Sequence, residues 1–383
     1  MPIDGIKNYI SSQMKRRAIV IGDSTHNTLS VVRSLGEAKI EQVLILKCEN
    51  DVCYVCKSKY LRHSDIYRIS RIEECLDVLQ RLKDIEGQTI ICSFDEAAMF
   101  VDANEPYLSE YFRTPARGKQ IGKLFNKDEQ CKLAEECGLT VPQSRLFSRK
   151  DGAGSLDNIE YPALIKPLYS TEGEKSDIHI CKNKEEIEQA LKEQSHCEEF
   201  ILQQFIDKEF ELDCIGVRTE KGMFLPGGVK KIRHYPPLIG AGAYGLFQEV
   251  DAFGVDKKAL ERFLEKSHYY GPFSVEFLHK GGENYFMEVN FRNEGLAYAA
   301  TKAGANLHAL YMNPGLSFES VKMRQVYMMN YSLDFLYVKN GDISLWTWLR
   351  DFFRTRCFIN ISFSDLSPVL SYYKTKFKSV FAR

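Results

Sequence analysis

The chain has 383 residues, of which 44% are hydrophobic and 27% charged, with a formal net charge of -1 at pH 7. This is the composition of an ordinary globular protein, long enough for two or three domains, and its near-neutral charge gives no general attraction to nucleic acid or anionic membrane. Apolar runs such as residues 17–22 and 43–46 are too short to span a bilayer, and we read no secretory signal at the N-terminus.

Eleven cysteines are scattered through the chain without the spacing of a disulfide framework. Because no export signal accompanies them, we interpret them as reduced thiols and predict a cytoplasmic protein. Cys53 and Cys56 form a single C-x-x-C pair. Without a second pair this spacing is weak evidence for zinc, and it lacks the context of a redox motif.

Residues 17–120 read as a small α/β unit. Buried strands over 17–24, 41–47 and 88–96 alternate with helical patterns over 26–37 and 72–84. This alternation predicts a parallel, doubly wound, Rossmann-like sheet. No G-x-G-x-x-G follows the first strand, so a dinucleotide site has little support.

The next segment brings lysines to two unusual places. Asn126 can cap a helix that opens with Lys127 and ends before Gly138. Lys166 lies inside the apolar strand "ALIKPL", where a lysine is rare unless an anion pairs with it. Further on, residues 234–250 are rich in glycine and proline, and we expect a loop there.

Residues 285–295, "YFMEVNFRNEG", place polar side chains at alternate positions of a strand. Glu288, Asn290 and Arg292 should therefore share one face. The opposite face would carry Met287, Val289 and Phe291.

An upstream strand over 273–278, followed by Gly281 and Gly282, predicts a hairpin whose register stays open. A two-residue turn would set Glu276 opposite Met287 and away from Glu288, whereas a three-residue loop would set Glu276 opposite Glu288. Like charges facing each other destabilise a sheet unless a cation lies between them. Paired carboxylates with an amide oxygen suit Mg²⁺ that also binds substrate phosphates.

Five features then follow one order: a lysine opening a helix that ends in Gly-x-x-x-Pro, a lysine in "YPALIKP", a small polar loop, "QQFI", and "ExNxR". Together they resemble the ATP-grasp superfamily of carboxylate–amine ligases, which includes biotin carboxylase, carbamoyl phosphate synthetase, D-alanine–D-alanine ligase and D-aspartate ligase. The resemblance covers residues 18–310, with "SKY" at 58–60 similar to the family's pre-grasp domain.

The resemblance implies a site for ATP and Mg²⁺, with Mn²⁺ as an alternative ion. The implied phosphate contacts are Lys127 and Lys166, and the implied metal ligands are Glu276, Glu288 and Asn290. The phosphate loop would include Thr171 and Gly173, although it is poorer in glycine than family loops. The residues implied for adenine and ribose are Gln203, Gln204, Ile206 and Glu209, with Glu211 competing with Glu209 for the ribose.

Two residues are implied in catalysis. Arg292 matches the group that faces the transferred phosphate, and Lys231 is the second candidate. Lys230 and His234 either contact substrate or belong to a basic surface cluster.

The predicted fold class is α/β and α+β, in four parts. They are a Rossmann-like pre-ATP-grasp domain (1–120), an ATP-grasp central lobe (121–200), a C-terminal lobe with the metal site (201–314) and an extension (315–383). The aromatic spacing in the extension, "WTWLRDFFRTR", is typical of core packing, with an amphipathic membrane anchor as the alternative.

The resemblance implies a ligase that joins a small-molecule carboxylate to an amine (or a thiol) through an acyl phosphate and releases ADP and phosphate. We expect no nucleic-acid partner, no membrane span and a homodimer. The extension resembles those of ATP-grasp ligases associated with bacterial cell-wall or surface-polysaccharide pathways, which implies substrates of that kind. Two alternatives remain: a nucleotide-binding regulator without catalysis, and a phosphotransferase on the same fold.

Overall fold

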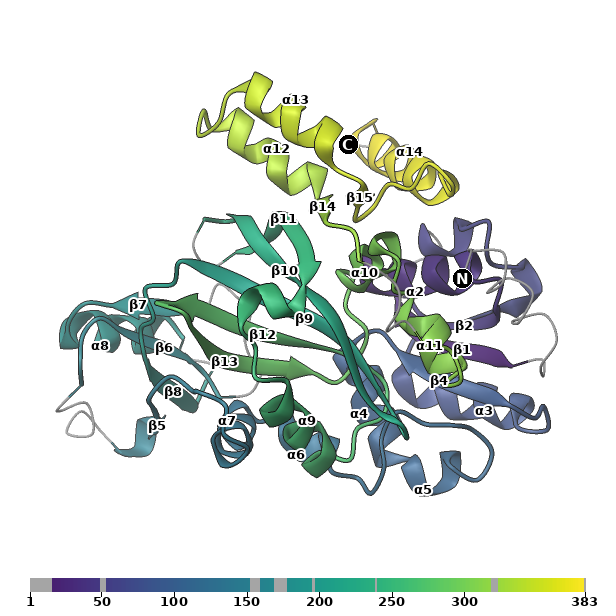
Figure 1. Ribbon diagram of the computed structural model, residues 1–383, viewed down its shortest axis with the longest axis horizontal. Coiled ribbons are helices and arrows are strands. Elements are labelled where there is room, and N and C mark those ends of the chain that lie inside the picture. The colour runs from purple at the N-terminus through teal and green to yellow at the C-terminus, as the bar shows by residue number, and fades with distance from the viewer. Residues whose placement is uncertain are drawn as a thin grey trace.

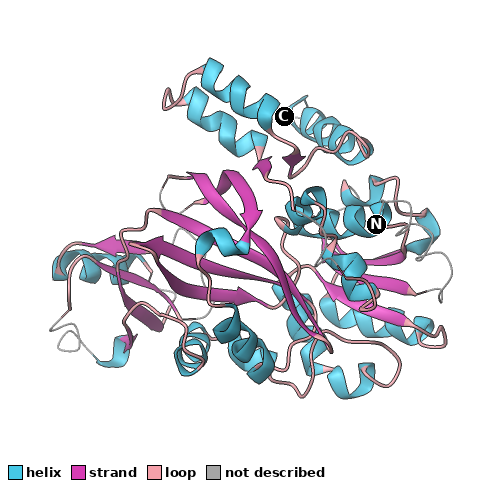
Figure 2. Ribbon diagram, viewed as in Figure 1, coloured by secondary structure: helices cyan, strands magenta, loops and turns pink. Residues whose placement is uncertain are grey.

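We describe the protein from a computed structural model. The described residues are 16–48, 53–151, 159–168, 178–194, 197–237, 240–317 and 323–381, without the side chains of 375–381. Three sheets organise the described residues, with helices packed around them and a helical C-terminal layer along one edge (Figures 1 and 2). These observations confirm the predicted order of a parallel sheet followed by antiparallel sheets.

The N-terminal sheet is parallel, in the order β3-β2-β1-β4. Its strands are β1 (Arg17–Asp23), β2 (Glu41–Lys47), β3 (Ile66–Ile69) and β4 (Gln88–Cys92). Its helices are α2 (His26–Glu37), α3 (Cys75–Leu82), α4 (Asp95–Ala103) and α5 (Glu105–Leu108). The sequence missed β3 because this short edge strand has only one fully buried residue and no apolar run.

A second, antiparallel sheet has the order β5-β8-β6-β7. It consists of β5 (Ser144–Ser148), β6 (Ala163–Pro167), β7 (His179–Cys181) and β8 (Glu199–Gln204), with α6 (Ile121–Leu124), α7 (Lys127–Glu136) and α8 (Lys184–Glu193) nearby. The Asn126 side chain accepts hydrogen bonds from Asp128 N and Glu129 N, which confirms the predicted cap of α7. Gly138 follows the helix at a φ of +88°, a conformation that favours glycine.

The largest sheet has the order β13-β12-β9-β10-β11-β14-β15. Its strands are β9 (Phe210–Thr219), β10 (Gly222–Tyr235), β11 (Ala241–Glu249), β12 (Pro272–Lys280), β13 (Glu283–Asn290), β14 (Val326–Met329) and β15 (Cys357–Phe358). The helices α9 (Lys257–Lys266), α10 (Ala297–Ala303) and α11 (Leu307–Met312) accompany it.

The expectation of a loop over residues 234–250 is wrong, because β11 occupies most of it. Gly245, one of the glycines that suggest a loop, instead allows β11 to pack closely against β10. A Cβ on Gly245 would lie 2.7 Å from Val229 Cγ1 and 3.0 Å from the carbonyl oxygen of Lys230.

The β12–β13 hairpin combines features of both registers considered above. Gly281 and Gly282 form a two-residue turn, with Lys280 opposite Glu283. Both glycines have positive φ (+60° and +84°), as a type I′ turn requires. A β-bulge then shifts the register, so that Glu276 lies directly opposite Glu288.

The bulge explains why the turn has two residues and why Glu276 nevertheless lies opposite Glu288. The three-residue loop is wrong, whereas the carboxylate pairing that it implied is confirmed. Met287 is the extra residue and is only half-buried. Phe286 takes the core position expected for Met287, beside Val289 and Phe291.

The C-terminal segment is built into the fold. Its strands β14 and β15 extend the largest sheet, and α12 (Tyr331–Lys339), α13 (Leu345–Arg354) and α14 (Ser367–Phe381) form the outer layer (Figure 1). The core-packing interpretation is confirmed for Trp348 and Phe352, which belong to a cluster with Tyr244. It is wrong for Trp346 and Phe353, which are exposed.

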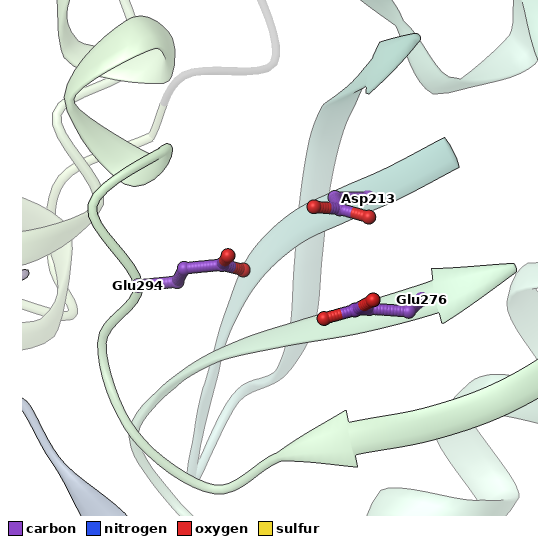
Figure 3. Close-up of side chains that lie close together, drawn as sticks. All are labelled: Asp213, Glu276 and Glu294. Carbon is purple, nitrogen blue, oxygen red and sulfur yellow. The ribbon is translucent and has the colours of Figure 1, made fainter. Parts of the chain in front are cut away.

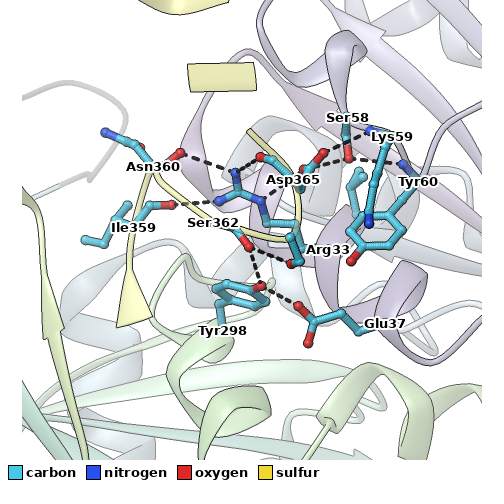
Figure 4. A network of polar contacts seen from close by, with 12 residues as sticks. Arg33, Glu37, Ser58, Lys59, Tyr60, Tyr298, Ile359, Asn360, Ser362 and Asp365 are labelled. Carbon is cyan, nitrogen blue, oxygen red and sulfur yellow. Dashed lines mark hydrogen bonds and ion pairs between the residues drawn. The ribbon is translucent and has the colours of Figure 1, made fainter. Parts of the chain in front are cut away.

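A fully buried ion pair fastens this segment to the N-terminal domain (Figure 4). Arg33 Nε lies 3.2 Å from Asp365 Oδ2, and the guanidinium also donates to the carbonyl oxygens of Ile359 and Asn360. The Asp365 carboxylate accepts further hydrogen bonds from Ser58 Oγ and Lys59 N, both at 2.9 Å. Both charges are therefore surrounded by polar partners.

We expect Asp365→Ala to lower the free energy of unfolding by about 3–5 kcal/mol, because Arg33 would keep its charge in a buried place without a counterion. Urea unfolding measures the change. The matched control is Asp65→Ala, which breaks the half-exposed Arg17–Asp65 pair and should cost under about 1 kcal/mol. Equal losses in the two variants would contradict the importance of burial.

Candidate nucleotide and metal site

Helix α7 is tied to the hairpin by a side chain that acts as an extra strand partner. Val289 N donates to Gln130 Oε1 at 2.7 Å, and Gln130 Nε2 donates to the Val289 carbonyl at 3.2 Å. β13 is an edge strand, so these bonds satisfy backbone groups that no strand pairs. Lys127 lies one helical turn before Gln130, on the same side of α7. The bonds thereby bring Lys127 towards Glu288.

Two lysines and one glutamate influence one another here. Lys166 is 5% exposed, and its Nζ donates to Gln203 Oε1 at 3.1 Å. Burial, followed by the charge of Lys127, lowers the pKa of Lys166 to about 8. Burial and the charge of Glu276 raise the pKa of Glu288, while Lys127 and Lys166 oppose that rise. The structure therefore brings Lys127, Lys166 and the Glu276–Glu288 pair into one site, as predicted.

The Asn290 side chain joins this face of the hairpin. Its Nδ2 donates to Ser274 Oγ at 3.1 Å and to Glu276 Oε1 at 3.4 Å, and its Oδ1 accepts from Arg292 Nη2 at 3.1 Å. Glu276, Glu288 and Asn290 thus lie on the same face, with the amide nitrogen of Asn290 directed at Glu276 and its oxygen at Arg292.

Lys231 lies among carboxylates from neighbouring strands. Its Nζ is 2.9 Å from Asp213 Oδ1, 3.0 Å from Glu211 Oε2 and 3.6 Å from Glu276 Oε2. Although burial favours the neutral amine, Asp213, Glu276 and Glu211 hold the pKa of Lys231 well above its ordinary value. Lys231 is therefore a fixed cation and cannot serve as a general base near neutral pH.

Asp213, Glu276 and Glu294 approach one another beside this lysine (Figure 3). One carboxylate oxygen from each lies within 4.8 Å of the others. Asp213 is 1% exposed, and burial raises its pKa well above the ordinary value although Lys231 opposes the rise. Three carboxyl groups therefore meet beside Lys231.

An irregular stretch of β10 directs His234 towards Glu211, the carboxylate that also contacts Lys231. The register slips on both sides of Arg233, so Lys231 and His234 approach Glu211 together although they are three positions apart in the chain. His234 Nε2 lies 3.1 Å from Glu211 Oε2. Although burial acts to raise the pKa of Glu211, His234 and Lys231 hold it below the ordinary value. Lys230 lies elsewhere, with its Nζ 4.1 Å from the centre of the Phe210 ring.

Arg292 connects the hairpin to the N-terminal domain. Its Nε lies 2.7 Å from an oxygen of Asp95, the first residue of α4, and its side chain is 14% exposed. The guanidinium is therefore held between the two domains.

The remaining predicted residues are placed as follows. Gln203 is buried and bonded to Lys166, and Ile206 is 5% exposed. Gln204 is exposed at the end of β8. Glu209 is exposed and accepts a hydrogen bond from Gly281 N at 3.0 Å. Glu211 instead belongs to the Lys231 group, by which we mean Lys231 with the carboxylates of Glu211, Asp213 and Glu276. Thr171 and Gly173 lie outside the described residues.

Three acidic members of the site were not predicted: Asp95, Asp213 and Glu294. Asp213 could have been found, because it lies two residues after Glu211 and shares its strand face. Glu294 likewise continues the alternation of Asn290 and Arg292. Asp95 lies 197 positions before Arg292, and no local signal connects the two.

Comparison with known families gives the site its context. The ATP-grasp domain family matches residues 132–295, which contain Lys166 and the whole hairpin. This segment matches the ATP-grasp superfamily. None of the helices that the structure describes combines the length and apolar character needed to cross a membrane.

The individual proteins that match this chain have low sequence identity to it. The formate-dependent phosphoribosylglycinamide formyltransferase of a Nitratiruptor species is 28% identical over 187 residues, 47% of each chain. The match therefore spans about half of this curated relative. N5-carboxyaminoimidazole synthetase of Staphylococcus aureus with ADP has a TM-score of 0.66 at 15% identity, covering 85% of this chain and 86% of that one.

A third relative is the biotin carboxylase domain dimer of Hydrogenobacter thermophilus 2-oxoglutarate carboxylase, whose structure holds MgADP, ADP and bicarbonate. Its TM-score is 0.62 at 14% identity, covering 80% of this chain and 73% of that one. At such identities these structural likenesses show the shared fold.

The donor atoms fit the Mg²⁺ that the ATP-grasp fold implies. Glu276, Glu288 and Asn290 offer the hard oxygen ligands that Mg²⁺ binds in proteins. Burial first, and then the facing charge of Glu276, raises the pKa of Glu288, so a cation bound between the two carboxylates would favour their ionised forms. Lys127 and Lys166 are the cations whose charges act on Glu288, and their role as phosphate contacts stays a prediction.

We expect the affinity for Mg–ATP to fall as the pH rises through about 8, because Lys166 then loses its charge in the free protein. Bound phosphate favours the ammonium form, so binding above this pH must take up a proton, and affinity can fall by up to about tenfold per pH unit. Calorimetric titration in buffers of different ionisation enthalpy measures the uptake.

The matched controls are Lys166→Arg and Lys127→Arg. Arginine keeps its charge, so Lys166→Arg should remove the proton uptake, while Lys127→Arg should keep it. Uptake that persists in Lys166→Arg would assign the titrating proton to another group.

Proposed function

We propose that this chain is an ATP-dependent ligase. It phosphorylates a small carboxylate to an acyl phosphate, joins the acyl group to an amine, and releases ADP and phosphate. The observation that carries the proposal is the pairing of Glu276 with Glu288 across the hairpin, next to Asn290 and the two lysines.

The first step needs positioning and charge neutralisation more than a protein nucleophile. Lys127 and Lys166 bind the phosphate oxygens of ATP. Glu276, Glu288 and Asn290 would hold Mg²⁺, which supplies positive charge at the phosphates when it is bound. A carboxylate oxygen of the substrate attacks the γ-phosphorus while the bond to the ADP oxygen breaks.

Arg292 is held where the two domains meet, by Asp95 on one side and Asn290 on the other. Its guanidinium stabilises the charge that develops on the transferred phosphate. In the second step the amine attacks the acyl carbon, and phosphate leaves. Lys231, permanently charged, keeps Glu211, Asp213 and Glu276 close together beside this reaction space.

The donor that we favour is a one-carbon carboxylate, formate or bicarbonate. The curated relative is named as formate-dependent, and the carboxylase relative was solved with bicarbonate. Neither name refers to cell-wall or surface-polysaccharide chemistry, so that expectation has no support here. A homodimer and a cytoplasmic location remain predictions, the former favoured by the dimer of the carboxylase domain.

The deciding experiment supplies formate or bicarbonate labelled with oxygen-18, together with ATP, Mg²⁺ and a panel of amines. An acyl phosphate transfers one labelled oxygen to the phosphate that is released. Labelled phosphate together with ADP supports the ligase. A stable phosphorylated product would instead identify a phosphotransferase, and nucleotide binding without any ADP formation would identify a regulator.

We expect Arg292→Ala to bind Mg–ATP nearly as well as the parent while losing about 10²–10³-fold in turnover, because its charge matters most in the transition state. Arg292→Lys should recover little, since a lysine cannot reproduce the planar guanidinium. Nucleotide titration and ADP release are measured on the same preparations. If Arg292→Ala lost affinity for Mg–ATP in proportion to turnover, Arg292 would bind the nucleotide before the reaction and would not act mainly in the transition state.

A further inference from the structure

Large apolar side chains are exposed along one side of α13. Leu345 is 50% exposed, Trp346 81% and Phe353 74%. The other side of the same helix is packed: the rings of Trp348 and Phe352 are stacked with centroids 5.0 Å apart. α13 therefore has one aromatic side within the protein and another in solvent.

Helix geometry makes the exposed set continuous. At about 100° per residue, Leu345, Leu349, Phe353 and Trp346 fall within about 100° of arc, the width of an amphipathic helix's apolar face. Arg350 follows at the border of this stripe and is exposed. We call Leu345, Trp346, Leu349 and Phe353 the α13 stripe.

The orientation of α13 is fixed from its opposite side. Arg233 of β10 donates to Asp351 Oδ2 at 2.9 Å and forms two hydrogen bonds with Asp334 of α12, at 2.7 and 2.8 Å. Both aspartates are buried, at 3% and 0% exposure. The helix therefore cannot turn its stripe inwards without breaking these ion pairs.

The same pairs leave the surface of this layer positive. Within residues 331–374 the exposed basic residues outnumber the exposed acidic ones, since Asp342 is the single exposed carboxylate of that range. Asp334, Asp351 and Asp365 are buried in pairs with Arg233 and Arg33. The exposed cations are Lys339, Arg350 (which is also paired with Asp351), Arg354, Arg356 and Lys374. The chain as a whole has a net charge of -1, so this layer differs from the rest.

We propose that the α13 stripe lies on the surface of an anionic lipid bilayer, with its apolar side chains at the level of the headgroups and the flanking cations against lipid phosphates. Tryptophan, leucine and phenylalanine beside arginine are the composition of helices that lie in a membrane interface. Exposed cations within a Debye length of an anionic leaflet add attraction.

A second copy of the chain fits this surface less well. The core of a protein interface is depleted of charge, whereas the exposed Arg350 borders the stripe. A ten-residue helix is about 15 Å long, and one such stripe falls short of the roughly 800 Å² per partner of a stable interface.

The protein contains two tryptophans, Trp346 and Trp348. Trp348 Nε1 is buried and has no hydrogen-bond partner among the described residues, so Trp348→Phe removes an N–H that contributes little. In this variant Trp346 is the sole tryptophan and reports on the stripe. We expect its emission to shift to the blue with phosphatidylserine-containing vesicles and to be quenched by brominated lipid. An unchanged spectrum at saturating lipid would overturn the proposal.

Vesicle cosedimentation gives an independent measurement. Leu345→Asp should weaken binding to anionic vesicles by at least tenfold, while Leu146→Asp, at 52% exposure on β5, should leave it unchanged. Binding should be weaker at high salt and with phosphatidylcholine alone. Equal binding of the parent and Leu345→Asp would overturn the proposal. So would a concentration-dependent dimer that Leu345→Asp dissociates, since that result assigns the stripe to a second copy.

Discussion

The site depends on keeping two carboxylates opposite each other. Glu276 and Glu288 occupy paired positions of adjacent strands, an arrangement that costs free energy in an isolated hairpin. The neighbouring positive groups reduce this cost: Lys127 and Lys166 act on Glu288, and Lys231 acts on Glu276. Each comes from a different element, α7, β6 and β10. The pairing therefore constrains the relative placement of both antiparallel sheets.

One extra residue makes the pairing compatible with a tight turn. Without the bulge at Met287, the two-residue turn at Gly281 and Gly282 would have moved Glu288 to the opposite face of the strand. Sequence could not decide this, because a bulge is set by packing: Phe286 and Val289 both enter the core, and Gln130 holds the backbone of Val289. The alternation of polar residues was visible in sequence, whereas its register depended on a contact 159 positions away.

Local chemistry decided which parts could be predicted. The cap at Asn126 needs only its neighbours, and a lysine within an apolar strand, Lys166, stands out by itself. The parallel N-terminal sheet likewise follows from strands that alternate with helices. The Arg292–Asp95 and Arg33–Asp365 pairs join distant segments of the chain. The residues next to either arginine do not indicate which aspartate it pairs with. The glycines of β11 misled because glycine permits a turn and a close strand contact equally.

The C-terminal layer and the site share a strand. β10 carries Lys231 and, two residues later, Arg233, which is paired with Asp334 and Asp351 of the layer. Tyr337 of α12 also donates to the carbonyl oxygen of His234, whose ring contacts Glu211. The register of β10 is irregular around Arg233. As a result Arg233 contacts the C-terminal layer, while the next residue, His234, contacts Glu211 in the site. The C-terminal layer is therefore packed and ion-paired against the same strand, β10, that carries Lys231 and His234.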